Sequence, residues 1–102
     1  GLKNHNLIKP IKKKSKFHVY HLYVVAHKNI NRDIIFKKLK KSNIFLGVQY
    51  PYPLHKMLAY KNSSYKDLRV TEKYSKKIFS LPTYPTIENS KIKKIIKLLN
   101  KI

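Results

Sequence analysis

The sequence lacks cysteine and tryptophan altogether, and it has only two glycines and four acidic residues in 102 positions. The absence of cysteine excludes disulfides and thiolate metal sites, and it fits the reducing conditions of the cytoplasm. Because Gly1 and Gly47 are the only glycines, a glycine-rich phosphate-binding loop is also excluded. The longest apolar stretch, residues 22–26, is far shorter than the ~20 residues that a membrane span needs. We therefore expect a cytoplasmic protein that does not enter a membrane.

The remaining composition suits one compact domain. A chain of 102 residues is too short for two domains of ordinary size. Hydrophobic residues make up 42% of the sequence, a share that predicts a folded core rather than a disordered chain. The sequence starts at Gly1 instead of a methionine, and we interpret it as a piece of a longer protein.

The charge is strongly unbalanced, because 24 lysines and arginines accompany the four acids and give a net charge of +20. Such a charge attracts polyanions of any sequence through counterion release. Arginine, the residue of bidentate phosphate and base contacts, occurs only as Arg32 and Arg69. The abundant lysine, isoleucine, asparagine and tyrosine have adenine- and thymine-rich codons, so genome bias accounts for much of the charge. We expect only non-specific contacts with nucleic acid, and a small basic RNA-binding or ribosomal protein is the alternative.

The first half of the chain predicts a strand, a helix and a second strand. Residues 1–16 are basic and irregular, which is typical of a solvated connector. Residues 17–27 are aromatic and β-branched and predict a strand covered on both faces. Asn31 offers an N-cap for a helix that ends near residues 40–41. Residues 44–50 predict the second strand, in which Gly47 indicates a bulge or a close backbone approach.

The second half of the chain predicts mainly helices. A Pro-x-Pro turn at residues 51–53 precedes a short helical turn at 54–60 and a polar loop at 61–67. Apolar residues at i, i+4 and i+8 predict a helix over about 69–79, with Val70, Tyr74 and Ile78 on one face. A short strand is expected near 79–81. The last helix is predicted over about 89–101, and its expected buried stripe is Ile92, Ile95, Ile96, Leu99 and Ile102.

These elements, taken in order, predict the fold class. The chain reads as strand, helix, strand and turn, followed by two helices with a short strand between them. This order predicts an α+β fold in which a small antiparallel or mixed sheet packs with about three helices.

The polar residues form no complete catalytic constellation. Most of the acids lie at or near expected helix starts, where capping and the helix dipole explain them better than acid–base chemistry. The histidines lack the i, i+4 spacing of a helical metal site, so we predict no metal ion. His21 and His55 are candidates for a functional role, although a hydrogen-bonded residue at the edge of a strand or turn is the commoner outcome. The four acids are Asp33, Asp67, Glu72 and Glu88.

The most unusual segment spans residues 47–60. It joins the end of a predicted strand to a turn bracketed by two prolines, and this turn carries Gln49, Tyr50 and His55. Rigid aromatic and polar groups at a strand end are well placed to contact a ligand. A purely structural turn, packed by its own tyrosines, explains the same residues equally well on physical grounds.

Five stretches keep the order and spacing of one known pattern over residues 7–102: VYHLYVV (19–25), NRDIIFKKLK (31–40), GVQYPYPLHKMLAY (47–60), FSLPTYP (79–85) and the terminal IKKIIKLLNKI. The combination of a Tyr-Pro-x-Pro-Leu-His turn with a later Ser-Leu-Pro-x-Tyr-Pro stop is specific, whereas either motif alone is weak. On these residues the chain resembles the C-terminal part of the DegT/DnrJ/EryC1/StrS family of nucleotide-sugar aminotransferases.

The resemblance implies the small domain of a homodimeric fold type I enzyme that uses pyridoxal 5′-phosphate. Such enzymes transfer an amino group from an amino acid, usually L-glutamate, to a keto sugar linked to UDP or dTDP, and their products enter surface polysaccharides and glycans. Residues 1–16 then connect from an N-terminal large domain, and residues 17–102 form the small domain. The cofactor lysine and most cofactor contacts belong to the large domain, so this chain alone is expected to carry no catalytic residue and no activity.

The resemblance also implies the substrate-binding residues. Family members often carry His-Tyr-Pro at the start of the turn, near the nucleotide sugar, and Gln49 and Tyr50 occupy the first two of these places. With His55, they are the substrate-binding residues that we predict. The sequence departs from the family where Gln49 replaces the frequent histidine and Ala26 stands in place of a frequent arginine. An inactive gene remnant is therefore a further alternative.

Overall fold

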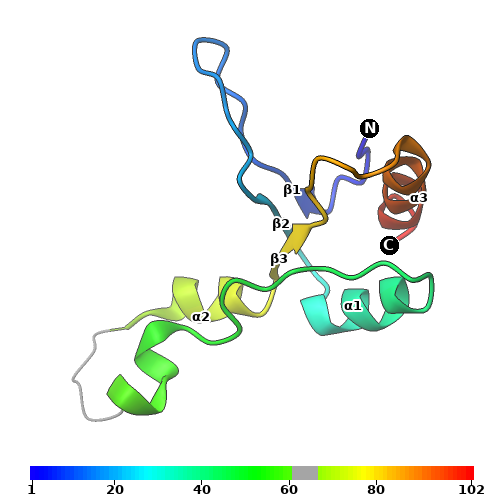
Figure 1. The fold of residues 1–102 in the computed structure, drawn as a ribbon. Coiled ribbons are helices and arrows are strands. Elements are labelled where there is room, and N and C mark those ends of the chain that lie inside the picture. Colours follow the sequence, from blue (N-terminus) through cyan, green and yellow to red (C-terminus); the bar gives the residue numbers. More distant parts are fainter. Residues whose placement is uncertain (61–66) are drawn as a thin grey trace.

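The computed structural model describes residues 1–60 and 67–102, and it confirms the predicted α+β class (Figure 1). All but the last residue of the expected polar loop at 61–67 lies outside the described residues. No helix within the described residues is long and apolar enough to cross a membrane. The elements in chain order are β1 (Leu7–Ile8), β2 (Tyr23–His27), α1 (Arg32–Lys40), the 3-10 helices η1 (Leu54–Lys56) and η2 (Leu58–Tyr60), α2 (Arg69–Ser75), β3 (Ile78–Leu81) and α3 (Asn89–Leu99).

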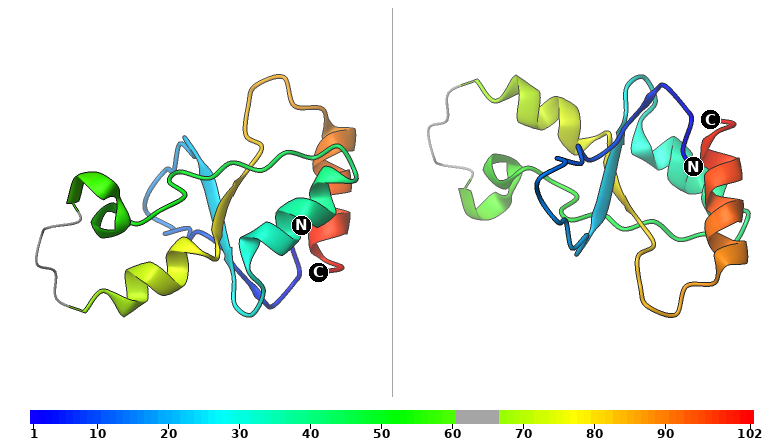
Figure 2. Two further views of the ribbon diagram at one scale, coloured as in Figure 1. Left: turned by 90° about the horizontal axis from the view of Figure 1, so that it is seen from below. Right: turned by 90° about the horizontal axis from the view of Figure 1, so that it is seen from above.

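The three strands form one antiparallel sheet in the order β1-β2-β3, with β2 in the centre. Leu7 pairs with His27 on one side of β2, and Phe79 pairs with Val25 on the other. Residues 25–27 are all buried, so both faces of the central strand are covered at this end, whereas Val24 is 39% exposed. In both views of Figure 2, α1 and α3 lie on one side of the strands, and α2, η1 and η2 lie on the other.

Helix α1 begins and ends at residues that suit those positions. The side chain of Asn31 caps the start by accepting a hydrogen bond from the Asp33 N–H at 3.0 Å. At the far end Asn43 adopts a left-handed conformation, with φ of 58°. The N–H of the next residue, Ile44, then donates to the Leu39 carbonyl at 3.1 Å. This is the Schellman arrangement, in which asparagine tolerates the left-handed geometry and the flanking apolar pair packs together.

The core lies between the sheet and the two helices α1 and α3. The predicted stripe of α3 is partly confirmed, because Ile95 and Leu99 are buried whereas Ile92 is 36% exposed. Burial of apolar surface at this interface supplies most of the stability of so small a domain. The core residues are Leu7, Val25, Ile35, Leu39, Ile44, Phe79, Ile95 and Leu99.

The first and last described residues are joined beside α3. The side-chain oxygen of Asn100 accepts hydrogen bonds from the N–H groups of Lys3, at 2.8 Å, and of Asn4, at 3.2 Å. In return, the Asn4 side chain donates to the Leu99 carbonyl at 2.9 Å. We call this set of contacts the terminal latch. Figure 1 shows both chain ends next to α3.

Two segments near the amino end differ from the sequence prediction. The expected irregular stretch at 1–16 contains β1, whose Leu7 enters the core. The expected strand at 17–27 begins only at Tyr23, because its partner β3 ends at Leu81 and the following proline has no N–H to donate. Residues 9–22 instead form a long loop that projects from the sheet (Figure 1), with Phe17 94% exposed.

The expected strand at 44–50 is reduced to a single bridge. Gly47 and Ser80 exchange two backbone hydrogen bonds, of 2.9 and 2.8 Å. A Cβ atom on Gly47 would lie 3.4 Å from the Ser80 Cβ and from the amide of Gln49. The predicted close backbone approach is thus present, and the Pro51 turn prevents further pairing.

The expected helix at 69–79 ends at Ser75, four residues early. Strand β3 takes the residues that follow, because their pairing with β2 buries Phe79, which is 1% exposed. Val70 and Tyr74, which were expected to share one apolar face of this helix, are 70% and 39% exposed. The strand predicted near 79–81 is confirmed as Ile78–Leu81. Tertiary pairing therefore overrides the local helical pattern here.

Candidate functional site

The predicted turn leaves the sheet at Gly47 and is fixed there through Gln49. The Ser80 hydroxyl donates a hydrogen bond of 2.9 Å to the side-chain oxygen of Gln49. Because that oxygen is occupied, the Nε2 amide is the group that Gln49 can offer to an anionic ligand. The peptide bond between Gln49 and Tyr50 is cis.

Tyr50 follows on the exposed side of the turn. It is 74% exposed, and Tyr52, two residues later, is 67% exposed. Pro51 and Pro53 restrict the backbone on either side of Tyr52. The turn therefore presents phenol groups from a constrained backbone, which is a suitable arrangement for contacting a polar ligand.

His55 lies in a different environment from the other two predicted residues. Its side chain is 9% exposed and donates from Nε2 to Oε1 of Glu72, in α2, at 3.0 Å. Lys56 reaches the same oxygen at 3.1 Å. The hydrogen bond from His55, and then that from Lys56, lowers the pKa of the Glu72 carboxyl below its ordinary value. His55 thus ties η1 to α2, while Gln49 and Tyr50 share the exposed turn.

The structure adds one residue that the sequence analysis did not select. Arg32, at the start of α1, is 8% exposed. Its Nη2 donates to the carbonyl of Pro51 at 2.9 Å, and its Nη1 donates to the carbonyl of Ser75. The only signal in the sequence is the rarity of arginine in a chain that otherwise uses lysine. Arg32 contacts the turn directly after Tyr50, and it belongs to the candidate site as a supporting residue.

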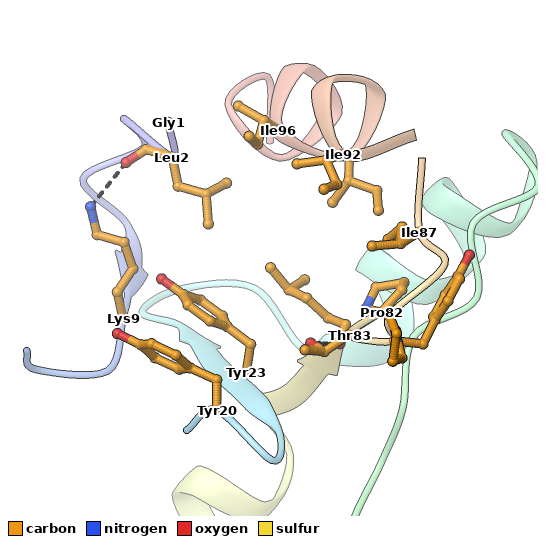
Figure 3. Close-up of a pocket in the computed structure, with 14 residues that line it drawn as sticks. Gly1, Leu2, Lys9, Tyr20, Tyr23, Pro82, Thr83, Ile87, Ile92 and Ile96 are labelled. Atoms are coloured by element: carbon orange, nitrogen blue, oxygen red, sulfur yellow. Dashed lines mark hydrogen bonds between the residues drawn. The ribbon is translucent and has the colours of Figure 1, made fainter. Parts of the chain in front are cut away.

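A mainly apolar hollow lies elsewhere in the described structure. It is a groove of about 770 Å³ between the amino end, the ends of β2 and β3, and α3. Figure 3 shows Leu2, Tyr23, Ile92 and Ile96 around it. The Lys9 ammonium, at its edge, donates to the Leu2 carbonyl at 2.9 Å. None of the predicted substrate-binding residues lines this groove.

The described residues do not fit a pyridoxal phosphate site. The cofactor is held covalently by a lysine whose pKa is lowered by burial or neighbouring cations. Every lysine in ranges 1–60 and 67–102 is exposed or half-buried. The same ranges contain no group of three histidines or carboxylates that could hold a metal ion.

One histidine is buried without belonging to the turn. His27, at the end of β2, is 1% exposed, and its Nδ1 accepts hydrogen bonds from the N–H groups of Asn29, at 3.2 Å, and Ile30, at 3.0 Å. Desolvation by burial, together with the nearby Lys77 ammonium, lowers the pKa of His27 below its ordinary value. Through these two hydrogen bonds the neutral ring holds the loop between β2 and α1 in place.

This histidine predicts how stability depends on pH. Because the pKa of His27 is lower in the folded state, the unfolded state takes up its proton first as the pH falls below about 6.5. The free energy of unfolding should then decrease, by at most about 1.4 kcal/mol per pH unit, and level off once the folded state is also protonated. Urea denaturation between pH 5 and 8, followed by circular dichroism, measures this effect.

The matched control is His27→Asn, whose side-chain oxygen can replace Nδ1 as the acceptor without titrating. The difference in unfolding free energy between wild type and His27→Asn should shrink as the pH falls through this range. A difference that is independent of pH would contradict the assignment.

The comparisons with known proteins agree with the fold. Residues 1–100 match the model of the DegT/DnrJ/EryC1/StrS aminotransferase family. The small α+β domain is thus part of an aminotransferase fold. The chain belongs to the DegT/DnrJ/EryC1/StrS aminotransferase family, as its sequence motifs predict.

Individual relatives give the same result. The chain is 33% identical to dTDP-3-amino-3,4,6-trideoxy-alpha-D-glucose transaminase of Micromonospora megalomicea subsp. nigra, with 97% of this chain covered. It is 28% identical to dTDP-3-amino-3,6-dideoxy-alpha-D-galactopyranose transaminase of Aneurinibacillus thermoaerophilus, with 98% covered. It spans 27% of the length of each of these relatives. A DegT DnrJ EryC1 StrS aminotransferase from Brucella abortus superimposes with a TM-score of 0.80 at 26% identity, over 94% of this chain and 26% of that one.

Proposed function

We propose that this chain is the small domain of a pyridoxal-phosphate-dependent nucleotide-sugar aminotransferase. The proposed reaction transfers an amino group from an amino acid, L-glutamate in our expectation, to a keto sugar carried by dTDP or UDP. The observation that carries the proposal is the family match over residues 1–100, which includes the whole turn at 47–60. The names of the two curated relatives, both dTDP-sugar transaminases, favour dTDP over UDP.

The proposal extends to the protein that contains this domain. Residues 1–16 lead in from a large domain and contribute β1 to the sheet, and residues 17–102 form the body of the small domain. The complete enzyme acts as a homodimer in the cytoplasm, and its aminated sugar enters a surface polysaccharide or another glycan. The extent of the relatives supports this view, because this chain spans only 27% of their length.

In the proposed mechanism, the described residues bind and orient the nucleotide sugar. The Tyr50 phenol donates a hydrogen bond to a phosphate or sugar oxygen, and the Gln49 Nε2 amide donates beside it. The Ser80 hydroxyl fixes the Gln49 amide, and the His55–Glu72 pair fixes the following 3-10 helix. Pyridoxal phosphate, when bound to the large domain, supplies the electron sink for amino transfer.

We predict that the 102-residue chain alone neither attaches pyridoxal phosphate to a lysine nor transfers amino groups. The reason is that none of its described lysines is buried, so none has the surroundings of a cofactor lysine. The chain is mixed with the cofactor, treated with borohydride and analysed by mass spectrometry. Stoichiometric labelling of one lysine in this chain would disprove the prediction.

An amino-transfer assay on a complete polypeptide tests the proposed function. The polypeptide consists of the large domain of a family member followed by this chain. It should convert a dTDP-linked keto sugar and L-glutamate into the amino sugar. If it binds the cofactor but aminates no nucleotide sugar, the proposed substrate class is wrong. Tight, sequence-selective RNA binding at physiological salt would instead favour the RNA-binding alternative.

A further inference from the structure

The guanidinium of Arg32 lies where three segments of the chain meet. It extends from the start of α1 and donates to the carbonyl of Ser75, at the end of α2, and to that of Pro51, in the turn. The backbone N–H of Arg32 also donates to the Lys76 carbonyl at 3.0 Å. One residue thus joins α1, α2 and the turn through its backbone and both ends of its guanidinium fork.

The position of Arg32 is unfavourable for its own helix. A cation in the first turn of a helix is repelled by the helix dipole, and a buried cation loses its hydration. The nearest carboxylate, that of Asp33, is 3.6 Å from Nε and mostly exposed. The carbonyls of Ser75 and Pro51 compensate for this loss, and that of Ser75 lies at a helix C-terminus, where the dipole favours a cation. The side chain therefore stabilises the junction rather than α1.

We infer that Arg32 is a positioning residue that holds the Gln49–Tyr50 segment against the domain. Its hydrogen bond to Pro51 fixes the backbone directly after Tyr50, while the Ser80 hydroxyl fixes the residue directly before it. The segment is held on both sides, and the Tyr50 side chain remains 74% exposed. The importance of this clamp for substrate binding rests on the proposed function, whereas the clamp itself does not.

The first experiment tests the clamp in the unmodified 102-residue chain. Because the sequence contains only Arg32 and Arg69, labelling with ¹⁵N-arginine gives two sets of side-chain NMR signals. The Arg32 Nη protons should give separate, slowly exchanging signals, since two carbonyls hold the guanidinium. Arg69, whose side chain is 90% exposed, should give averaged signals. Averaged, rapidly exchanging signals from both arginines would overturn the proposal.

The second experiment uses Arg32→Lys, with Arg69→Lys as the matched control. A single ammonium keeps the charge but cannot reproduce the planar fork. The amides of Lys56 and Met57, which donate within η1 and just after it, should exchange about ten to a hundred times faster in Arg32→Lys. Exchange within β2 and β3 should stay unchanged, which separates loosening of the turn from global unfolding. Unchanged exchange in the turn would overturn the proposal.

Kinetics of the complete enzyme separate the clamp from the proposed function. Arg32→Lys should raise the KM for the dTDP-linked keto sugar about tenfold and leave the donor half-reaction unchanged, because the turn contacts only the nucleotide sugar. Arg69→Lys should change neither. Faster exchange of the turn with an unchanged KM would support the clamp and count against Tyr50 as a substrate contact. An equal loss in both half-reactions would overturn the positioning role.

Discussion

Replacing Tyr50 with phenylalanine should raise the KM for the nucleotide sugar about ten- to a hundredfold in the complete aminotransferase. The phenol is exposed on a turn that Pro51 and Pro53 constrain, so under the proposed function its hydroxyl would meet the ligand from a fixed backbone. A hydrogen bond from a hydroxyl to a charged phosphate oxygen contributes about 1.5–3 kcal/mol, and about 1.4 kcal/mol corresponds to a factor of ten. Steady-state kinetics with a dTDP-linked keto sugar measure the effect.

Three control measurements test whether the effect on the KM is specific to Tyr50. The half-reaction with the amino donor should be nearly unchanged, because that step does not use the nucleotide. Tyr52→Phe, on the same exposed turn, should leave the KM almost unaltered. Gln49→Ala should raise the KM less than Tyr50→Phe does, since a neutral amide makes the weaker bond. If Tyr50→Phe leaves the KM unchanged or damages the donor half-reaction equally, the turn is structural and the site assignment is wrong.

Phe79→Ala should lower the free energy of unfolding by about 3–5 kcal/mol. Phe79 is 1% exposed, and its ring meets that of Phe36 edge-on, with the centroids 6.1 Å apart. The substitution removes this aromatic contact and leaves a cavity between the sheet and α1. Because domains are stable by only about 5–15 kcal/mol, the loss is a large share of the total. Urea denaturation followed by circular dichroism measures it in a chain without tryptophan.

Phe17→Ala provides the matched control. The same side chain is removed from the projecting loop, where Phe17 is 94% exposed, so the free energy of unfolding should change by less than about 0.5 kcal/mol. Equal losses for the two variants would show that Phe79 is not part of the core.

The elements that the sequence predicted well are those with signals at their own ends. Helix α1 begins after Asn31, whose side chain caps it, and the chain turns at Asn43, which adopts a left-handed backbone conformation. Helix α3 carries its apolar stripe at helical spacing, and Ile95 and Leu99 are buried as that spacing requires. Such local patterns can be interpreted without knowledge of the rest of the chain.

The elements that the sequence predicted poorly depend on distant partners. Residues 17–22 have the composition of a strand, but β3 is too short to pair with them. The helical stripe expected over 69–79 stops because Phe79 pairs with Val25, more than fifty residues earlier. Strand length is set by the partner as much as by the strand itself, and one sequence does not reveal where a partner ends.

In the candidate site, too, residues with local signals were predicted and the contacts to distant partners were not. Gln49 and Tyr50 were selected by a compact motif, and the structure places both on one exposed turn. His55 belongs to the same motif, yet its ring is held by Glu72, which lies seventeen positions later. Arg32 could not be selected, because its partners are backbone carbonyls, and every residue in the sequence has one.

The terminal latch has a consequence for the order in which this domain folds. During synthesis the residues that close the core, Ile95 and Leu99, leave the ribosome after every other core residue. Leu7 can pair with β2 early, but Lys3 and Asn4 wait for Asn100, 97 and 96 positions later, and the sheet remains uncovered by α3 until that helix is made. The core of the domain is consequently completed only after α3 has been made. Its many lysines keep the waiting chain charged, and this charge opposes aggregation while the apolar strands are exposed.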